Sequence, residues 1–138
     1  MAKYLVGIDA GHGNIRGGAV GYADENVQND KIADKVEIEL KKYCEVVRLD
    51  DESERGNSLT DRTNKAKKEN VDMIISIHAN AGGGEGIETY IHNKLATDKD
   101  RKFAELVQNK LIENTSFKNR GVKTANFHMV REASTENR

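Results

Sequence analysis

The sequence predicts an α/β fold in which a mostly parallel central sheet lies between layers of helices, as a three-layer sandwich. Short apolar runs alternate with segments of helical periodicity, which is typical of a parallel sheet with crossover helices. One run, residues 71–77, is nearly continuous in apolar residues, as in a strand covered on both faces. The sequence shows no repeat, low-complexity segment or linker, so we expect residues 1–138 to form one domain.

The first half of the chain is expected to begin with a strand at residues 4–8, which ends in the glycine-rich turn at 9–13. Residues 14–24 have no period and are expected to be loop. Apolar residues then recur at helical spacing over residues 27–43. Residues 44–49 follow as a second strand, and their lone cysteine is expected to be a buried, unreactive thiol.

In the second half, residues 50–57 are expected to form a charged loop. Ser58 and Asp61 then resemble a capping box that opens a helix reaching about residue 69. Residues 71–77 are the clearest strand and are expected to be central in the sheet. Beyond the glycines at 82–84, a strand, a helix and a last short strand are expected at residues 87–92, 97–111 and 126–130.

Composition excludes two classes of partner. Hydrophobic residues make up 36% of the chain and charged residues 33%, which is a polar globular composition. The 22 basic and 23 acidic residues are interspersed, so no basic surface is expected to hold nucleic acid. No run of about 18 apolar residues occurs, so we expect no membrane insertion.

Two histidines stand at positions where parallel sheets usually bind their ligands. His12 follows the first strand, and His78 follows the strand at residues 71–77. Ligands of open α/β sheets bind beyond the carboxyl ends of the strands, and two such ends can be neighbours. Two imidazoles and one carboxylate are the protein ligands of a hydrolytic zinc site, which keeps one position for water. These positions predict a candidate zinc site.

The carboxylate ligand is expected between the two strands. Glu25 is best placed, at the start of the first helix, and spacing alone does not exclude the adjacent Asp24. Asp9 ends the first strand and is a candidate to orient the His12 imidazole without touching the metal. The alternative is that both histidines are structural, that the glycines beside His12 form a turn, and that Asn80 caps a loop.

A series of motifs runs in order along the chain. They are Ile8-Asp-Ala-Gly-His-Gly13, Glu25 with Asn29, Leu59-x-x-Arg62 with Ala66, Ser76-Ile-His-Ala-Asn80, Gly86-Ile-Glu-Thr-Tyr90, and Arg120-Gly-Val122 with Asn126-Phe127. In this order the motifs resemble the zinc-dependent N-acetylmuramoyl-L-alanine amidases called amidase 3, which occur in bacterial cell-wall hydrolases and phage endolysins. The resemblance covers essentially the whole chain and departs from the family pattern at Ala10, where proline is common.

The resemblance implies that His12, Glu25 and His78 bind Zn2+. It implies hydrolysis of the amide that joins N-acetylmuramic acid to L-alanine in peptidoglycan, so the expected partner is a muramoyl peptide. It also implies that Arg62 and Asn80 shape the groove or support the site. The N-terminus lacks the apolar segment of a secretory signal, so we expect synthesis in the cytoplasm and action on the cell wall after phage-type release or another export route.

In the family, the general acid/base is a glutamate in the pattern apolar-x-Glu-x-Gly-Phe, which does not occur before Arg138. Glu132 resembles a different family glutamate and Glu136 lacks the flanking pattern, so neither is assigned as catalytic, although either could stand in. We therefore expect a domain that is incomplete at its C-terminus, lacks the last strand and hydrolyses the amide poorly, since a positioned acid contributes about 10²–10⁴-fold. The alternatives are a non-catalytic peptidoglycan-binding domain of the same fold and a zinc peptidase.

Overall fold

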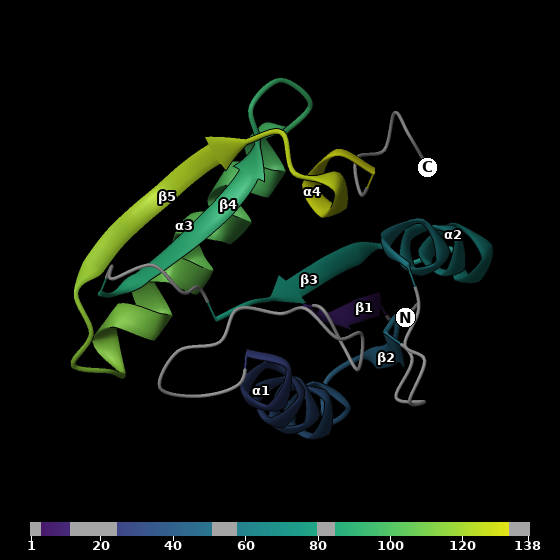
Figure 1. Cartoon of the computed structure of the whole chain (residues 1–138), viewed down its shortest axis with the longest axis horizontal. Helices are drawn as coiled ribbons and strands as arrows, with labels where there is room; N and C mark the ends of the chain where they lie inside the picture. The colour runs from purple at the N-terminus through teal and green to yellow at the C-terminus, as the bar shows by residue number, and fades with distance from the viewer. Residues whose placement is uncertain (1–3, 12–24, 51–57, 80–84, 133–138) are drawn as a thin grey trace. The chain divides into compact units, whose positions relative to one another are not determined.

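The computed structural model describes residues 4–11, 25–50, 58–79 and 85–132, and gives only the backbone of residues 25 and 26 (Figure 1). The chain divides into two compact units, Met1–Gly82 and Gly83–Arg138. The prediction of one domain for the whole chain stays a prediction. The elements are β1 (Leu5–Ala10), α1 (Glu25–Leu40), β2 (Glu45–Arg48), α2 (Leu59–Glu69), β3 (Met73–Ile77), β4 (Ile87–His92), α3 (Asp98–Glu113), β5 (Asn119–Ala125) and α4 (His128–Glu132).

The first unit contains a parallel sheet whose described strands have the order β2-β1-β3. The α/β class with parallel strands between helices is therefore confirmed. The expectation that residues 71–77 form the central strand is wrong for the described sheet. There β1 is central and buried along nearly its whole length, whereas every residue of β3 is only partly buried. A continuous apolar run reports that a strand is covered, and it does not report the position of that strand in the sheet.

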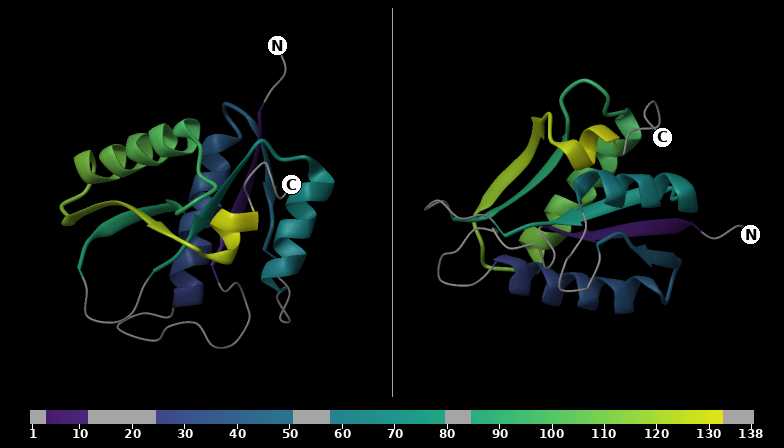
Figure 2. Two further views of the ribbon diagram at one scale, coloured as in Figure 1. Left: turned by 90° about the horizontal axis from the view of Figure 1, so that it is seen from above. Right: turned by 45° about the vertical axis from the view of Figure 1, so that its right-hand side comes forward.

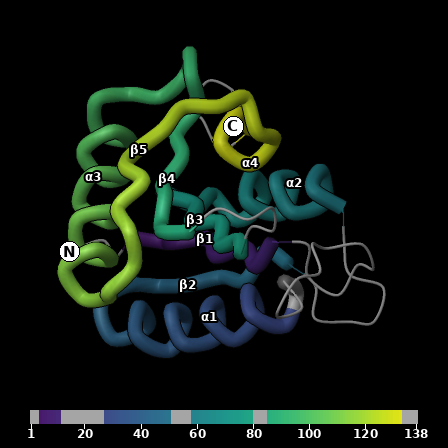
Figure 3. Tube along the Cα trace, turned by 60° about the vertical axis from the view of Figure 1, so that its left-hand side comes forward, coloured from purple at the N-terminus to yellow at the C-terminus, as the bar shows by residue number. Residues whose placement is uncertain are grey.

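The two faces of β1 carry different side chains because successive residues of a strand point to opposite sides. Val6, Ile8 and Ala10 form the buried core with Ala33 of α1. Asp9 faces the other way, toward α2. The tube in Figure 3 shows α1 and α2 on opposite sides of this sheet. The alternation along one strand thus separates an apolar layer from a layer that holds a buried charge.

Local sequence signals set the helix ends. Ser58 and Asp61 form the predicted capping box, in which each side chain accepts a hydrogen bond of 3.1 Å from the backbone N–H of the other. Thr97 and Asp100 form a second capping box at the start of α3. The helix α1 ends at Leu40, earlier than predicted. No helix in the described part of the chain has the length and hydropathy needed to cross a bilayer.

The second unit contains the parallel pair β4 and β5, against which α3 packs (Figure 2). Gln108 of α3 is 1% exposed and connects all three elements. Its Oε1 accepts a hydrogen bond of 2.8 Å from Thr89 Oγ1, and its Nε2 donates to Ile87 O at 2.7 Å and to Asn119 Oδ1 at 2.8 Å. A buried amide with this many partners fixes the register of the helix on the strands.

The prediction of a strand at residues 126–130 is wrong, because the strand lies earlier, at β5, and residues 128–132 form α4. The sequence of β5 is polar and shows little period-2 pattern. Its charges are satisfied across the pair, since Lys123 and Arg120 contact Glu88 at 2.6 and 3.1 Å. The hydrogen bond from Lys123 lowers the pKa of the Glu88 carboxyl, burial opposes this, and the charge of Arg120 adds to it.

His92 is buried and has a structural role in the second unit. Its Nδ1 accepts hydrogen bonds from Leu95 N at 2.8 Å and from Lys94 N at 3.1 Å. The proton therefore lies on Nε2, which donates to Asn126 Oδ1 at 2.9 Å. The neutral ring thus stabilises the turn after β4. In the first unit, Cys44 is half-buried against the core, with Sγ 3.5 Å from Leu40 O.

Candidate functional site

The carboxyl ends of β1 and β3 lie side by side. Ala10 pairs with Ile77, and Gly11 N donates a hydrogen bond of 2.7 Å to Ile77 O. Since β2 and β3 flank β1 on opposite sides, these two ends form a point where the direction of strand connection reverses, a usual place for ligands. His12 follows Gly11 in the chain but lies outside the described residues, and His78 follows β3. The expected proximity of the two strand ends is confirmed for the backbone.

The absence of a side chain at Gly11 leaves the space that the His78 imidazole occupies. A Cβ atom built on Gly11 would lie 2.4 Å from both Cε1 and Nδ1 of His78, closer than any real contact. The ring therefore packs directly against the backbone at the end of β1, while the His78 residue as a whole stays exposed. An accessible imidazole in a defined position suits a ligand of a metal or of a substrate.

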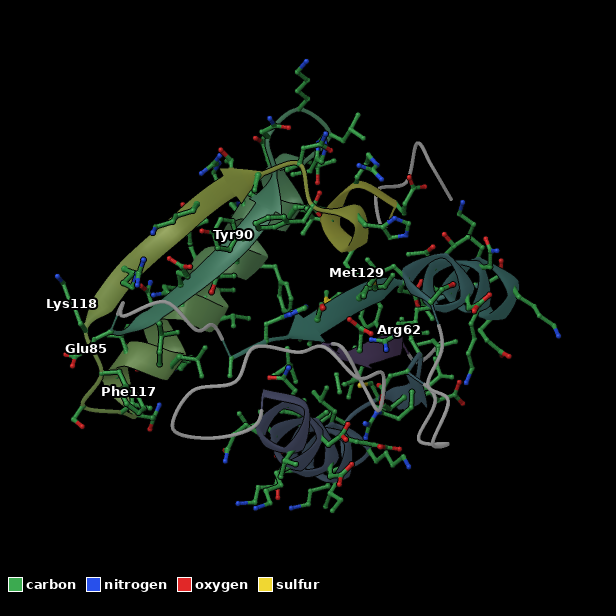
Figure 4. All side chains as sticks on the ribbon, in the orientation of Figure 1. Arg62, Glu85, Tyr90, Phe117, Lys118 and Met129 are labelled. Carbon is green, nitrogen blue, oxygen red and sulfur yellow. The ribbon has the colours of Figure 1, made fainter. Side chains whose placement is uncertain are left out.

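Arg62 and Asp9 form a buried ion pair near the end of β1. Arg62 is 1% exposed and Asp9 is 0% exposed. Arg62 Nη1 donates to Asp9 Oδ1 at 2.7 Å and to Ala10 O at 2.8 Å, and Figure 4 shows Arg62 between α2 and β1. Of the two roles expected for Arg62, its burial favours support of the site over contact with a substrate.

Ser76 connects the ion pair to the histidine. Its Oγ donates to Asp9 Oδ2 at 2.6 Å and lies 3.1 Å from His78 Nε2. Asp9 was expected beside His12, and its described side-chain partners are Arg62 and Ser76. Sequence reasoning did not single out Ser76, although it stands two residues before His78, on the same side of the strand.

The first helix is tied to the same strand end. Asn29 is fully buried, and its Nδ2 donates to Gly11 O at 3.0 Å. The backbone of Glu25 begins α1 one turn before Asn29. The side chain of Glu25 and the residues Asp24 and Asn80 lie outside what the structure describes, as does Glu136. Among the side chains described, no three potential metal ligands gather, so the ligand set stays a prediction.

A second charged pair, Arg48 and Asp50, contacts β1 at Ala10. Asp50 Oδ1 accepts a hydrogen bond of 2.9 Å from Ala10 N. Arg48 binds both oxygens of Asp50, at 3.0 and 2.8 Å, and Arg48 Nη1 also donates to Asp34 of α1 at 2.6 Å. Burial raises the pKa of Asp50, but the hydrogen bonds from Arg48 and Ala10 outweigh it and hold the pKa below its usual value.

Asp50→Asn is expected to lower the free energy of unfolding by about 1–3 kcal/mol at about pH 7, because Arg48, whose side chain is 10% exposed, loses a charged partner. A carboxyl whose pKa is lowered by folding stabilises the fold above its unfolded pKa of about 3.9, and this contribution disappears as the pH falls through the folded value. The difference from the wild type should therefore shrink below about pH 4 in urea unfolding curves.

Asp34→Asn is the matched control, because it removes a carboxylate that is 58% exposed from the same arginine. This variant should change stability by less than about 1 kcal/mol. Equal, pH-independent losses in Asp34→Asn and Asp50→Asn would contradict the assignment of the lowered pKa to a stabilising contact.

Comparison with known proteins adds a family. Residues 6–137 match the family described as N-acetylmuramoyl-L-alanine amidase. The sporulation-specific N-acetylmuramoyl-L-alanine amidase of Bacillus subtilis is 36% identical over 130 residues, which are 92% of this chain and 51% of that protein. The amidase CwlM of Bacillus licheniformis is 34% identical over 133 residues, again 92% and 51%. The chain thus spans about half the length of these relatives.

Solved structures have the same fold. An N-acetylmuramoyl-L-alanine amidase from Clostridium difficile 630 superposes with a TM-score of 0.86 and 33% identity, over 96% of this chain and 75% of that one. The catalytic domain of CwlV from Bacillus (Paenibacillus) polymyxa var. colistinus gives a TM-score of 0.83 and 32% identity, over 95% and 75%.

Proposed function

Because the chain belongs to the N-acetylmuramoyl-L-alanine amidase family, we propose that it hydrolyses the amide between N-acetylmuramic acid and L-alanine in peptidoglycan, with Zn2+ held by His12, Glu25 and His78. The observation that carries the proposal is the pairing of β1 with β3, which brings the residue before His12 against the ring of His78. Peptidoglycan is the proposed partner, and the proposed place of action is the cell wall, reached by release or export, as for an endolysin or autolysin.

The residues at the strand ends suit zinc. Two imidazoles and one carboxylate are the protein ligands that hydrolytic zinc sites use, and they leave one position for water. The missing side chain at Gly11 leaves room for the His78 ring, and Asn29 holds the start of α1 at the same strand end. The supports of His78 are hydrogen-bonded to one another, and two of them, Asp9 and Arg62, are buried, as expected around a metal ligand.

Zinc in such a site lowers the pKa of bound water to about 7 and polarises a carbonyl. In this chain a row of polar contacts holds the His78 imidazole in position. Arg62 neutralises Asp9, Asp9 accepts a hydrogen bond from Ser76, and Ser76 contacts His78. The departing alanine nitrogen must also receive a proton, and no residue of 1–138 is assigned that role. We therefore propose that residues 1–138 by themselves bind the metal and the wall but cleave the amide slowly.

The test combines metal analysis with product analysis. Purified protein should carry one zinc per chain, and His12→Ala and His78→Ala should lose it. Cleavage, where it occurs, should release peptides with a new amino-terminal alanine and stop after chelation. A wild-type zinc content well below one ion per chain, with the same content in both variants, would contradict the proposal. Wall binding without cleavage under every condition would favour the non-catalytic alternative, and faster cleavage of plain peptides would favour a peptidase.

A further inference from the structure

Arg62, Asp9, Ser76 and His78 form a row of hydrogen bonds, called the relay. In it, each group decides whether the next one donates or accepts. Arg62 has only donors, and it holds Asp9 as an ionised acceptor across 2.7 Å. The hydroxyl proton of Ser76 is then directed to Asp9 Oδ2 at 2.6 Å. A serine hydroxyl has a single proton, so Ser76 Oγ can only accept from the nitrogen that lies 3.1 Å away, His78 Nε2.

We propose that Ser76 is a positioning residue that fixes His78 as the Nε2–H tautomer, so that the metal binds at Nδ1. This inference rests on the proposed zinc site and assigns within it the nitrogen that coordinates. The direction of the relay comes from Arg62, whose guanidinium has N–H donors and no acceptor. The proton positions follow from the donors and acceptors of the network, as is usual where hydrogens are not observed.

The proposed tautomer suits metal binding for a physical reason. A metal ligand must present an unprotonated nitrogen, and the hydrogen bond made by the other nitrogen decides which one that is. Without the Ser76 hydroxyl, the ring loses the acceptor that favours a proton on Nε2 and a contact that fixes its plane. A fraction of the chains would then present a protonated Nδ1, and metal affinity would fall.

The first measurement needs no metal. Long-range proton–nitrogen correlation spectra of metal-free, ¹⁵N-labelled protein at about pH 8, above the ordinary histidine pKa of about 6.5, distinguish a protonated ring nitrogen from an unprotonated one. His78→Gln assigns the signals. The wild type should show protonated Nε2 and unprotonated Nδ1 at His78, and Ser76→Ala should show averaged signals. A wild-type ring protonated at Nδ1 would overturn the inference.

The second measurement is zinc affinity by competition with a chelator. Ser76→Ala should bind about 10- to 100-fold more weakly than the wild type, and Ser76→Thr, which keeps the hydroxyl, should restore most of the loss. Thr89→Val is the matched control, because it removes a partly buried, hydrogen-bonded hydroxyl from the other unit. It should lower thermal stability without changing zinc affinity. Equal affinity of Ser76→Ala and wild type would overturn the positioning role.

The two failures are distinguishable. If the wild type shows the Nε2–H tautomer but binds no zinc, the proposed function and the assignment of Nδ1 as the ligand are both overturned. If the wild type binds zinc and loses it in His78→Ala, while Ser76→Ala keeps both tautomer and affinity, the zinc site stands and the role of Ser76 is overturned.

Discussion

Arg62→Met is expected to lower the free energy of unfolding by about 3–5 kcal/mol, because it leaves the Asp9 charge buried without its cation. The two side chains are 1% and 0% exposed, so water cannot replace the lost partner unless the strand end opens. The measurement is urea unfolding at about pH 7 followed by circular dichroism.

The exposed pair of Lys42 and Glu39 provides the control for Arg62→Met. Its atoms lie 2.9 Å apart, but the side chains are 58% and 66% exposed. Lys42→Met should change stability by less than about 1 kcal/mol. The double variant Arg62→Met/Asp9→Leu should recover part of the loss, since an apolar pair carries no desolvation cost. A loss in Arg62→Met no greater than in Lys42→Met would show that the buried pair contributes little.

Gly11→Ala is expected to lower affinity at the proposed zinc site about 10- to 100-fold, because the new methyl group needs the space of the His78 ring. Its Cβ would lie 2.4 Å from two ring atoms of His78. The backbone cannot yield easily, since Gly11 N bonds to Ile77 O and Gly11 O accepts from Asn29. The imidazole has to move, and a displacement of about 1 Å is enough to lose a catalytic geometry.

Gly7→Ala is the matched control on the same strand. Its Cβ would meet Leu49 Cδ1 at 3.0 Å, which is the end of a leucine side chain and not a proposed metal ligand. This substitution should reduce stability modestly and leave zinc affinity unchanged. If Gly11→Ala bound zinc as tightly as Gly7→Ala, the position of the His78 ring would not control the site.

Patterns among residues close together in the sequence predicted most of the helices and strands. The capping box at Ser58 predicted the start of α2, and a box of the same kind at Thr97 begins α3, because a cap is satisfied by residues three positions apart in the chain. The error at the C-terminal side has a physical cause. The charges of β5 are paired with Glu88 of β4, so its strand character comes from a partner that lies far away in sequence. The apolar residues after β5 instead form the short helix α4.

The sequence alone determined the alternating α/β order, the position of His78 after a strand, and the residue types that are proposed to bind zinc. The tertiary structure decided that β1 and not β3 is central in the described sheet, and that Asp9 meets Arg62 and Ser76. Periodicity states which face a side chain occupies, because it is a property of neighbouring residues. It does not state which strands pair, because Ser76 and Asp9 are 67 residues apart and only the packed sheet brings them together.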